Sequence, residues 1–163
     1  MVSAAWQVAA TVPDPELPML TLADLGILRD VDESDGHVTV TITPTYSGCP
    51  AMREISHDLQ HRLHRAGYDD VRVHTALAPA WSSDWITDEG RRKLAAAGIA
   101  PPNPAGPARG PIPLTLAPRR RTITCPHCGS SETVETAAFS GTACKALYRC
   151  TACAEPFESV KEI

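Results

Sequence analysis

The sequence has no basic residue before Arg29, no long apolar run and no excess of positive charge. Its 163 residues carry a formal net charge of −4, so nothing draws it generally to nucleic acid or to an anionic membrane. The N-terminus lacks the positively charged segment of a secretory signal. No stretch approaches the roughly 18 apolar residues that a membrane-spanning helix needs. We therefore expect a cytoplasmic protein with no membrane partner.

Hydrolase and redox signatures are also missing. The sequence contains no Gly-x-Ser-x-Gly motif and no internal repeat. Cys49 is the only cysteine before Cys125, so it has no second cysteine at the spacing of a redox pair. The remaining cysteines are confined to the last forty residues. The two regions of the chain therefore use cysteine in different ways.

Proline divides the chain. Seven of the 15 prolines fall within residues 101–118, which excludes a helix and disfavours a sheet ladder there. Fully extended, this segment would span on the order of 55 Å. It is either an extended linker or an ordered strap over a neighbouring surface. We expect a domain at residues 1–100, a linker at 101–118 and a second domain at 119–163.

Hydrophobic periodicity predicts an α+β fold for the first domain. Apolar residues alternate with polar ones around Asp35-Gly36, which is typical of a hairpin turn. Four-residue and three-residue spacings predict amphipathic helices that end near Gly67 and Gly98. The expected order is helix 3–10, hairpin 31–44, helix 50–66, a strand from 71 and helix 88–97. The arrangement is a small mixed sheet covered by helices.

Two Cys-x-x-Cys pairs dominate the tail. Cys125 and Cys128 are separated from Cys150 and Cys153 by 21 residues. In a reducing compartment such pairs favour a metal over disulfides, and four thiolates complete a tetrahedron around zinc. A closed four-cysteine site is structural, so we expect zinc to stabilise a small ribbon of strands that is too short to fold by burial alone. His127, inside the first pair, is interpreted as a solvated spacer.

Other tail residues leave alternatives open. Cys144 has three interpretations: a thiol buried near the metal, a spare ligand or a reactive thiol. We favour the first. Arg119–Arg121 suggest nucleic-acid contact, although three arginines in an acidic protein are more often a solvated face. Phe139, Tyr148 and Phe157 are expected in the core of the tail.

Cys49 is placed for reactivity. Pro50 fits the first position of the following helix, so Cys49 is expected at or next to the N-cap, where backbone amides and the helix dipole lower the pKa of a thiol. Gly48 lets a partner approach closely. The alternative is a small buried cysteine that merely caps the helix.

Several polar residues have less specific interpretations. Asp14 and Glu16 lie in a proline-bounded turn, where their carboxylates either serve a metal or cap the turn. His57, His61 and His64 share the face of their helix opposite the apolar stripe. We expect them to face solvent, with the pair at positions i and i+4 able to bind a metal adventitiously.

Four motifs in this order resemble the MIP18 (DUF59) family of iron–sulfur assembly proteins. They are Asp14-Pro15-Glu16, Asp24-Leu25-Gly26, Gly48-Cys49-Pro50 and Trp81. The likeness covers about the first 100 residues. The tail TACKALYRCTACAEPF narrows it to accessory members of the phenylacetyl-CoA epoxidase system of aerobic phenylacetate degradation. The resemblance implies a MIP18-like mixed sheet with helices, followed by a C-terminal zinc ribbon.

The resemblance also implies a function. The protein would mature the di-iron site or the iron–sulfur centre of the epoxidase, with Cys49 as reactive thiol and a transient iron or iron–sulfur cluster as cargo. The oxygenase and reductase subunits would be its partners. Because one thiolate cannot hold a cluster, Asp14 and Glu16, a second copy of the chain or a client thiol must supply further ligands. The alternatives are a working oxygenase subunit or thiol enzyme that uses Cys49, and a zinc-ribbon module that docks protein or nucleic acid.

Overall fold

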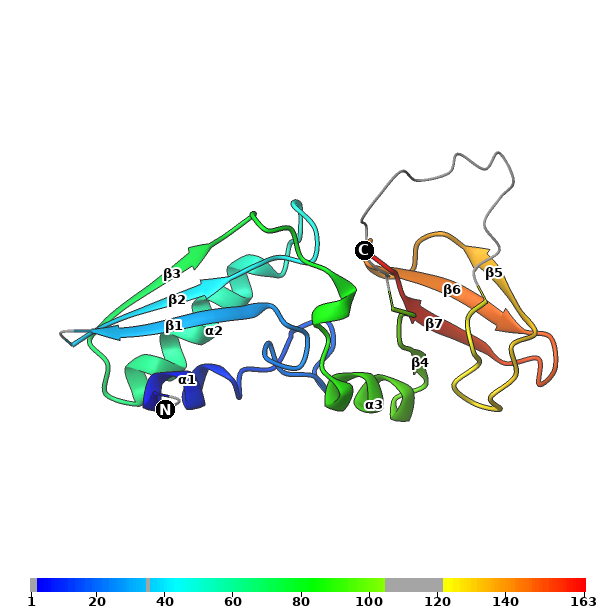
Figure 1. The fold of residues 1–163 in the computed structure, drawn as a ribbon, viewed down its shortest axis with the longest axis horizontal. Helices are drawn as coiled ribbons and strands as arrows, with labels where there is room; N and C mark the ends of the chain where they lie inside the picture. The colour runs from blue at the N-terminus through cyan, green and yellow to red at the C-terminus, as the bar shows by residue number, and fades with distance from the viewer. Residues whose placement is uncertain (1–2, 35, 105–121) are drawn as a thin grey trace. The chain divides into compact units, whose positions relative to one another are not determined.

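The chain divides into two compact units, Met1–Lys93 and Leu94–Ile163, each with its own sheet (Figure 1). The computed structural model describes residues 3–34, 36–104 and 122–163. Asp35, most of the proline-rich segment and Arg119–Arg121 lie outside the described residues, so the expected three-part division and the arginine run stay predictions. No helix among the described residues is long and apolar enough to cross a membrane.

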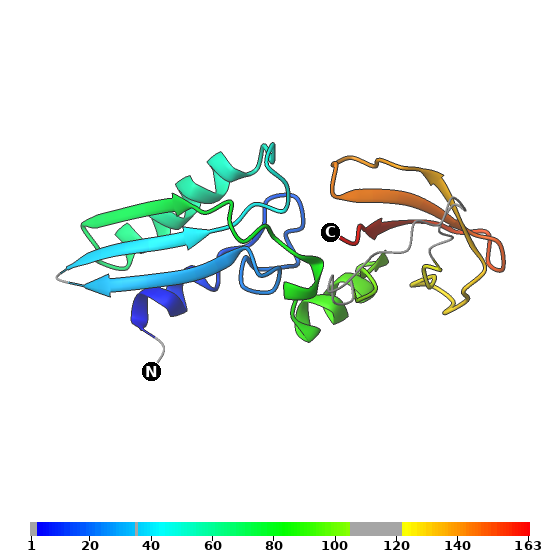
Figure 2. The ribbon, with the colours of Figure 1, turned by 45° about the horizontal axis from the view of Figure 1, so that its top comes forward.

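The first unit is a mixed three-stranded sheet with helices, as the periodicity predicted. Its strands run in the order β1-β2-β3, with β1 and β2 antiparallel and β2 and β3 parallel (Figures 1 and 2). The elements are α1 (Ala4–Ala9), β1 (Leu28–Ser34), β2 (His37–Ile42), α2 (Met52–Arg65), β3 (Asp70–Thr75), the 3₁₀ turn η1 (Ser83–Trp85) and α3 (Asp88–Ala96), which crosses into the second unit.

Burial along the strands follows the two-residue period. On the central strand Val38, Val40 and Ile42 are fully buried, whereas Thr39 and Thr41 on the opposite face are half-exposed. Helix α1 packs against β1 and α2, and α2 packs against β3. The core therefore lies between one face of the sheet and these two helices.

Helix α2 begins two residues later than predicted. Pro50 and Ala51 form a turn, and Ala51 is the N-cap with no side-chain acceptor for the first amides. The first helical bond runs from the Ile55 amide to the Ala51 carbonyl. Pro50 thus stands before the N-cap rather than at the first helical position. The other end matches the prediction, since Gly67 follows it at φ +98°.

The Asp24-Leu25-Gly26 segment holds residues 81–93 in place. The carbonyl of Leu25 accepts from the buried Trp81 Nε1 at 2.9 Å, and that of Asp24 accepts from the Thr87 amide at 2.9 Å. A Cβ on Gly26, which has φ +68°, would lie 2.6 Å from Trp85 Cβ, so only glycine fits. Two of the four family motifs, the Asp24 to Gly26 segment and Trp81, are thus explained by packing.

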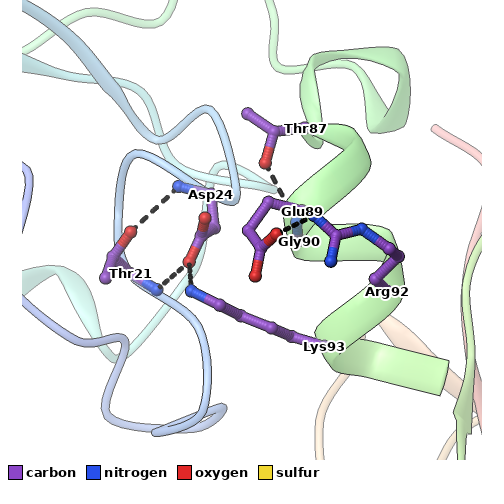
Figure 3. A network of polar contacts seen from close by, with 7 residues as sticks. All are labelled: Thr21, Asp24, Thr87, Glu89, Gly90, Arg92 and Lys93. Atoms are coloured by element: carbon purple, nitrogen blue, oxygen red, sulfur yellow. Dashed lines mark hydrogen bonds and ion pairs between the residues drawn. The ribbon is translucent and has the colours of Figure 1, made fainter. Parts of the chain in front are cut away.

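The Asp24 carboxylate links this segment to α3 (Figure 3). Its Oδ2 accepts from Lys93 Nζ at 2.7 Å and from the Thr21 amide at 3.0 Å, while Thr21 Oγ1 accepts from the Asp24 amide. Burial acts to raise the pKa of Asp24, but the bonds from Lys93 and Thr21 outweigh it and lower that pKa. Helix α3 also comes close to this segment at Gly90. A Cβ on Gly90 would lie 2.8 Å from the Asp24 carbonyl oxygen, so the short distance between α3 and Asp24 requires glycine there.

The second unit is a four-stranded sheet of order β4-β7-β6-β5. Its strands are β4 (Ile99–Ala100), β5 (Thr133–Ala137), β6 (Lys145–Cys150) and β7 (Pro156–Val160). Strands β5 and β6 fall between the two Cys-x-x-Cys pairs, where the sequence predicted a ribbon of strands, whereas β4 and β7 were missed. Strand β4 is only two residues long and pairs in parallel with β7, about sixty positions away in the chain. Residues 99 and 100, expected at the end of the first domain, thus pair within the second unit.

The core of this unit forms around the ribbon. Tyr148 and Phe157 stack with ring centroids 5.9 Å apart, as predicted for core aromatics. Phe139 was predicted wrongly, because its side chain is 65% exposed and Lys161 Nζ lies over its ring. It lies two residues beyond the end of β5. The buried cluster comprises Ala100, Ile123, Cys125, Ala146, Tyr148, Cys150 and Phe157.

The Asp24 network yields a test of the first unit. Asp24→Asn removes the charge that Lys93 and the Thr21 amide stabilise, so we expect the free energy of unfolding to fall by about 1–2 kcal/mol at pH 7. The pKa of Asp24 is lowered in the folded state. The stabilisation by its carboxylate is therefore fully present above the pKa of an aspartate in the unfolded chain, about 4. The difference should shrink as pH falls through the folded-state pKa. Denaturant unfolding at pH 7 and pH 3 measures both effects.

Glu89→Gln is the matched control, since Glu89 pairs with Arg92 on the exposed side of the same helix (Figure 3). We expect a change below about 0.5 kcal/mol at either pH. Equal losses in the two variants would show that the Asp24 network does not hold the segment.

Candidate functional site

Four cysteines of the second unit converge on one point. The sulfur atoms of Cys125, Cys128, Cys150 and Cys153 all lie within 4.8 Å of one another. The Cys125–Cys153 pair is 3.8 Å apart and the Cys128–Cys150 pair 3.6 Å. Sulfurs about 2.3 Å from one tetrahedral ion stand about 3.8 Å apart, whereas a disulfide requires about 2.05 Å. The arrangement fits a bound metal and excludes disulfides.

Both Cys-x-x-Cys turns use a left-handed residue directly after the second cysteine. Gly129 has φ +75°, and Ala154 has φ +64° at the equivalent place in the second turn. An alanine in this region is strained by roughly 1–2 kcal/mol. The sequence analysis missed Ala154, although its position relative to Cys153 repeats that of Gly129 relative to Cys128.

Backbone amides and neighbouring thiols set the ionisation of the cluster. The Cys153 amide donates to Cys150 Sγ at 3.5 Å, and this bond, despite burial and with help from the Ala152 amide, lowers the pKa of Cys150 to about 7. The Ser130 amide acts to lower the pKa of Cys128, but the thiol of Cys150 and burial raise it to about 12. Four thiolates this close need a cation to balance their charge.

Cys144 lies away from the cluster, contrary to the favoured expectation that it is buried near the metal. It is buried, with 9% exposure, but it precedes β6 while Cys150 ends that strand. Six residues of extended chain separate them by about 20 Å. The Cys144 sulfur instead lies 3.1 Å from Thr142 Oγ1. His127 is exposed and outside the four-thiol group, and its ring lies close to Gly98.

Cys49 lies half-buried in the loop between β2 and α2. Its amide donates to the Tyr46 carbonyl at 3.1 Å, and its own carbonyl accepts from the Met52 amide at 3.5 Å. Since the N-cap is Ala51, Cys49 stands two residues before it rather than at it. Helix-dipole effects fall off within about one turn, so the electrostatic case for a thiolate is weaker here than the sequence implied.

Gly48 is not required by the fold. It is exposed, and a Cβ there would come no closer than 3.7 Å to any atom outside its neighbours in the chain, an ordinary contact with the Tyr46 ring. This differs from Gly26 and Gly90, where a Cβ would collide with backbone or side chain. No contact among the described residues therefore requires a glycine beside Cys49, and the missing side chain leaves room for approach from outside.

Asp14 and Glu16 occupy a turn that Asp14 itself stabilises. Asp14 is 5% exposed, and its Oδ1 accepts from the amides of Glu16 at 2.9 Å and Leu17 at 2.8 Å. The capping interpretation of this carboxylate is thus observed directly. Glu16 is half-buried.

The structure does not gather these two carboxylates with Cys49. Across residues 3–34, 36–104 and 122–163, the four-cysteine cluster is the one group of three or more His, Cys, Asp or Glu side chains close enough to share an ion. A site built from Asp14, Glu16 and Cys49 of one chain would require a local rearrangement.

Two family models match the chain. The model for the iron–sulfur cluster assembly protein domain covers residues 4–75, which include the Cys49 loop. The model for the PaaD zinc beta ribbon domain covers residues 110–161, which include all four clustered cysteines.

Proteins of similar sequence include one that matches nearly the whole chain and one that matches about half of it. A protein of Escherichia coli (strain K12) that is named as a component of 1,2-phenylacetyl-CoA epoxidase is 40% identical over 96% of this chain and 90% of its own length. An Fe-S protein maturation auxiliary factor of Porphyromonas gingivalis (strain ATCC BAA-308 / W83) is 36% identical over 52% of this chain and 81% of its own.

Among solved structures, a DUF59 domain from Bacillus anthracis is 25% identical. It superposes with a TM-score of 0.51 over 55% of this chain and 87% of its own. The resemblance to the DUF59 family is therefore confirmed. The chain belongs to the PaaD family and combines an iron–sulfur cluster assembly domain with a C-terminal zinc beta ribbon.

Proposed function

We propose that this chain is an accessory maturation factor that helps to install iron or an iron–sulfur centre in a multicomponent phenylacetyl-CoA epoxidase. The observation that carries the proposal is the 40% identity, along nearly the whole chain, to a protein named as an epoxidase component. The iron–sulfur assembly domain at residues 4–75 and the likeness to an Fe-S maturation factor support maturation rather than oxygenation itself. The clients would be the oxygenase or reductase subunits.

Cys49 would be the thiol that handles the cargo. It is partly exposed, stands beside a glycine that the fold does not need, and belongs to the assembly domain. A thiolate is a soft ligand suited to iron and iron–sulfur clusters. Because a single thiolate binds a metal weakly, transfer to a client with more ligands would be favourable.

Glu16 is the better candidate co-ligand of the two acidic residues. Asp14 Oδ1 already accepts two amides, so a metal bound to that atom would compete with the turn. Substituting Glu16 with glutamine tests ligation without removing the turn's own acceptor, whereas Asp14→Ala would also disturb the loop.

The four-cysteine cluster would hold zinc and stabilise the second unit. Four thiolates leave no open position on a tetrahedral ion, so the site supplies folding energy and not catalysis. Binding of structural zinc provides about 10–16 kcal/mol in small domains. The ribbon would then present a fixed surface while Cys49 acts in the other unit.

We expect the purified protein to contain about one zinc ion per chain, and Cys125→Ser to lose it. Elemental analysis gives the metal content, and two-dimensional NMR reports which unit loses structure. Signals of the second unit should collapse toward those of an unfolded chain, while signals of the first unit persist. Because the thiols must be deprotonated to bind, chelator-assisted release should speed up as pH falls.

Cys144→Ser is the matched control, since it removes a buried cysteine of the same unit that lies outside the cluster. It should keep the metal. Iron in place of zinc would overturn the assignment of the ion. Equal metal loss in both variants would instead point to a general effect of removing a buried thiol.

The maturation role predicts an effect of Cys49→Ala on a partner protein. The epoxidase oxygenase is expressed with the wild-type chain, with Cys49→Ala, or alone, and its iron content and turnover are measured. We expect an iron-poor, inactive oxygenase in the last two cases, because the variant lacks the transfer thiol. The variant itself should keep its zinc and its circular dichroism spectrum. Gly48→Ala should reduce maturation partially, by hindering approach of the client.

Cys144→Ala provides the control for loss of an isolated thiol and should support full maturation. A fully metallated, active oxygenase obtained with Cys49→Ala would refute the role of this cysteine. A metallated oxygenase that still needs the chain during turnover would make the chain a working subunit.

A further inference from the structure

Helix α2 carries a pair of histidines that neither the metal cluster nor the Cys49 loop uses. His57 and His61 are one turn apart on the side opposite the buried Ile55, Leu59 and Leu63, and both are exposed. Their imidazole rings are nearly parallel, with an interplanar angle of 6° and centroids 6.4 Å apart. Side chains at i and i+4 of a helix stand one above the other, which is the spacing of a two-nitrogen chelate.

We propose that His57 and His61 bind one divalent late first-row transition ion, such as Ni²⁺ or Zn²⁺, through one nitrogen each, with water in the remaining positions. Imidazole is a borderline ligand that suits these ions, whereas Mg²⁺ and Ca²⁺ require oxygen. This inference does not rest on the proposed maturation function.

The distance between the rings is close to that of a bound state. Two imidazoles on one tetrahedral ion, each about 2.1 Å from it through nitrogen, have ring centres about 5 Å apart. The pair at 6.4 Å therefore needs to close by about 1 Å. Histidines that reach solvent can make this movement through χ2, which has a broad energy profile. No change in the helix backbone is required.

The helix under the pair is held firmly. Leu59 lies between the two histidines in sequence and is fully buried, as is Leu63, so the turn that carries both rings is anchored to the core. A fixed backbone reduces the entropy lost when the second nitrogen binds, which strengthens a chelate relative to a single histidine.

A third histidine on this side has a separate contact. His64 Nδ1 lies 2.7 Å from the Tyr68 carbonyl oxygen, at the end of the helix. This bond holds the His64 ring toward the residues after the helix and leaves His57 and His61 as the pair that shares an ion. His64 is thus an exposed histidine of the same helix that is not a ligand, and it serves as a control.

The surrounding charges are mixed. Glu54 and Arg53 lie one turn before the pair and Arg65 one turn after it, while Asp58 is paired with Arg62 at 3.1 Å. The nearby charges offset each other, so the nitrogens themselves, rather than a general acidic field, would provide selectivity for the ion.

Isothermal titration of Ni²⁺ into the untagged, zinc-loaded full chain tests the site. The wild type should bind one Ni²⁺ that His57→Ala and His61→Ala each weaken by about tenfold or more, because each variant leaves a single imidazole. His64→Ala should bind like the wild type. Mg²⁺ should give no binding. None of the three substitutions is at a buried position, and circular dichroism confirms that each variant is folded.

Three results would overturn the site. They are no Ni²⁺ binding by the wild type, equal binding by the wild type and all three variants, or a loss in His64→Ala as large as in His57→Ala. The last result would show that the histidines act as a diffuse surface and not as a defined pair. Retention of the untagged protein on a nickel resin, reduced in His57→Ala and His61→Ala, provides an independent readout.

Discussion

The spacing of four sulfur atoms is the constraint on which the second unit depends. Thiols within 4.8 Å of one another and outside disulfide distance need a cation to balance their ionised forms. Two of them, Cys125 and Cys150, also belong to the buried hydrophobic cluster with Tyr148 and Phe157. The metal site and the apolar core therefore share residues, and loss of the ion would disrupt both together. This explains how so small a sheet can be stable.

In the first unit, the motifs shared with iron–sulfur assembly proteins separate into two groups. Asp24, Leu25, Gly26 and Trp81 make contacts that the fold requires, because their carbonyls, indole and missing Cβ hold the segment before α3. Gly48 has no comparable steric reason. Residues that a fold does not need are the stronger indicators of function. This contrast makes the Cys49 loop a stronger functional candidate than the buried Asp24-Leu25-Gly26 segment.

Asp14 belongs to the Asp14-Pro15-Glu16 motif, but its side chain has a structural role. Its carboxylate caps the turn by accepting from the amides of Glu16 and Leu17, and it is almost fully buried. In the proposed function the two units have different roles. The ribbon would hold a closed set of ligands, while Cys49 of the assembly domain would offer a partly exposed thiol with an incomplete one, as transfer of a metal centre requires.

The sequence by itself determined the features that depend on local spacing. The 3.6-residue period of α2, the alternation on β2, the hairpin and the two Cys-x-x-Cys turns were all predicted, because each needs only neighbours along the chain. Only the tertiary structure decided features that depend on distant partners. The parallel pairing of β4 with β7, the exposure of Phe139 and the distance of Cys144 from the cluster follow from how strands meet. The left-handed Ala154, which the repeat of the Cys-x-x-Cys turn could have indicated, and the late start of α2 were also missed from the sequence.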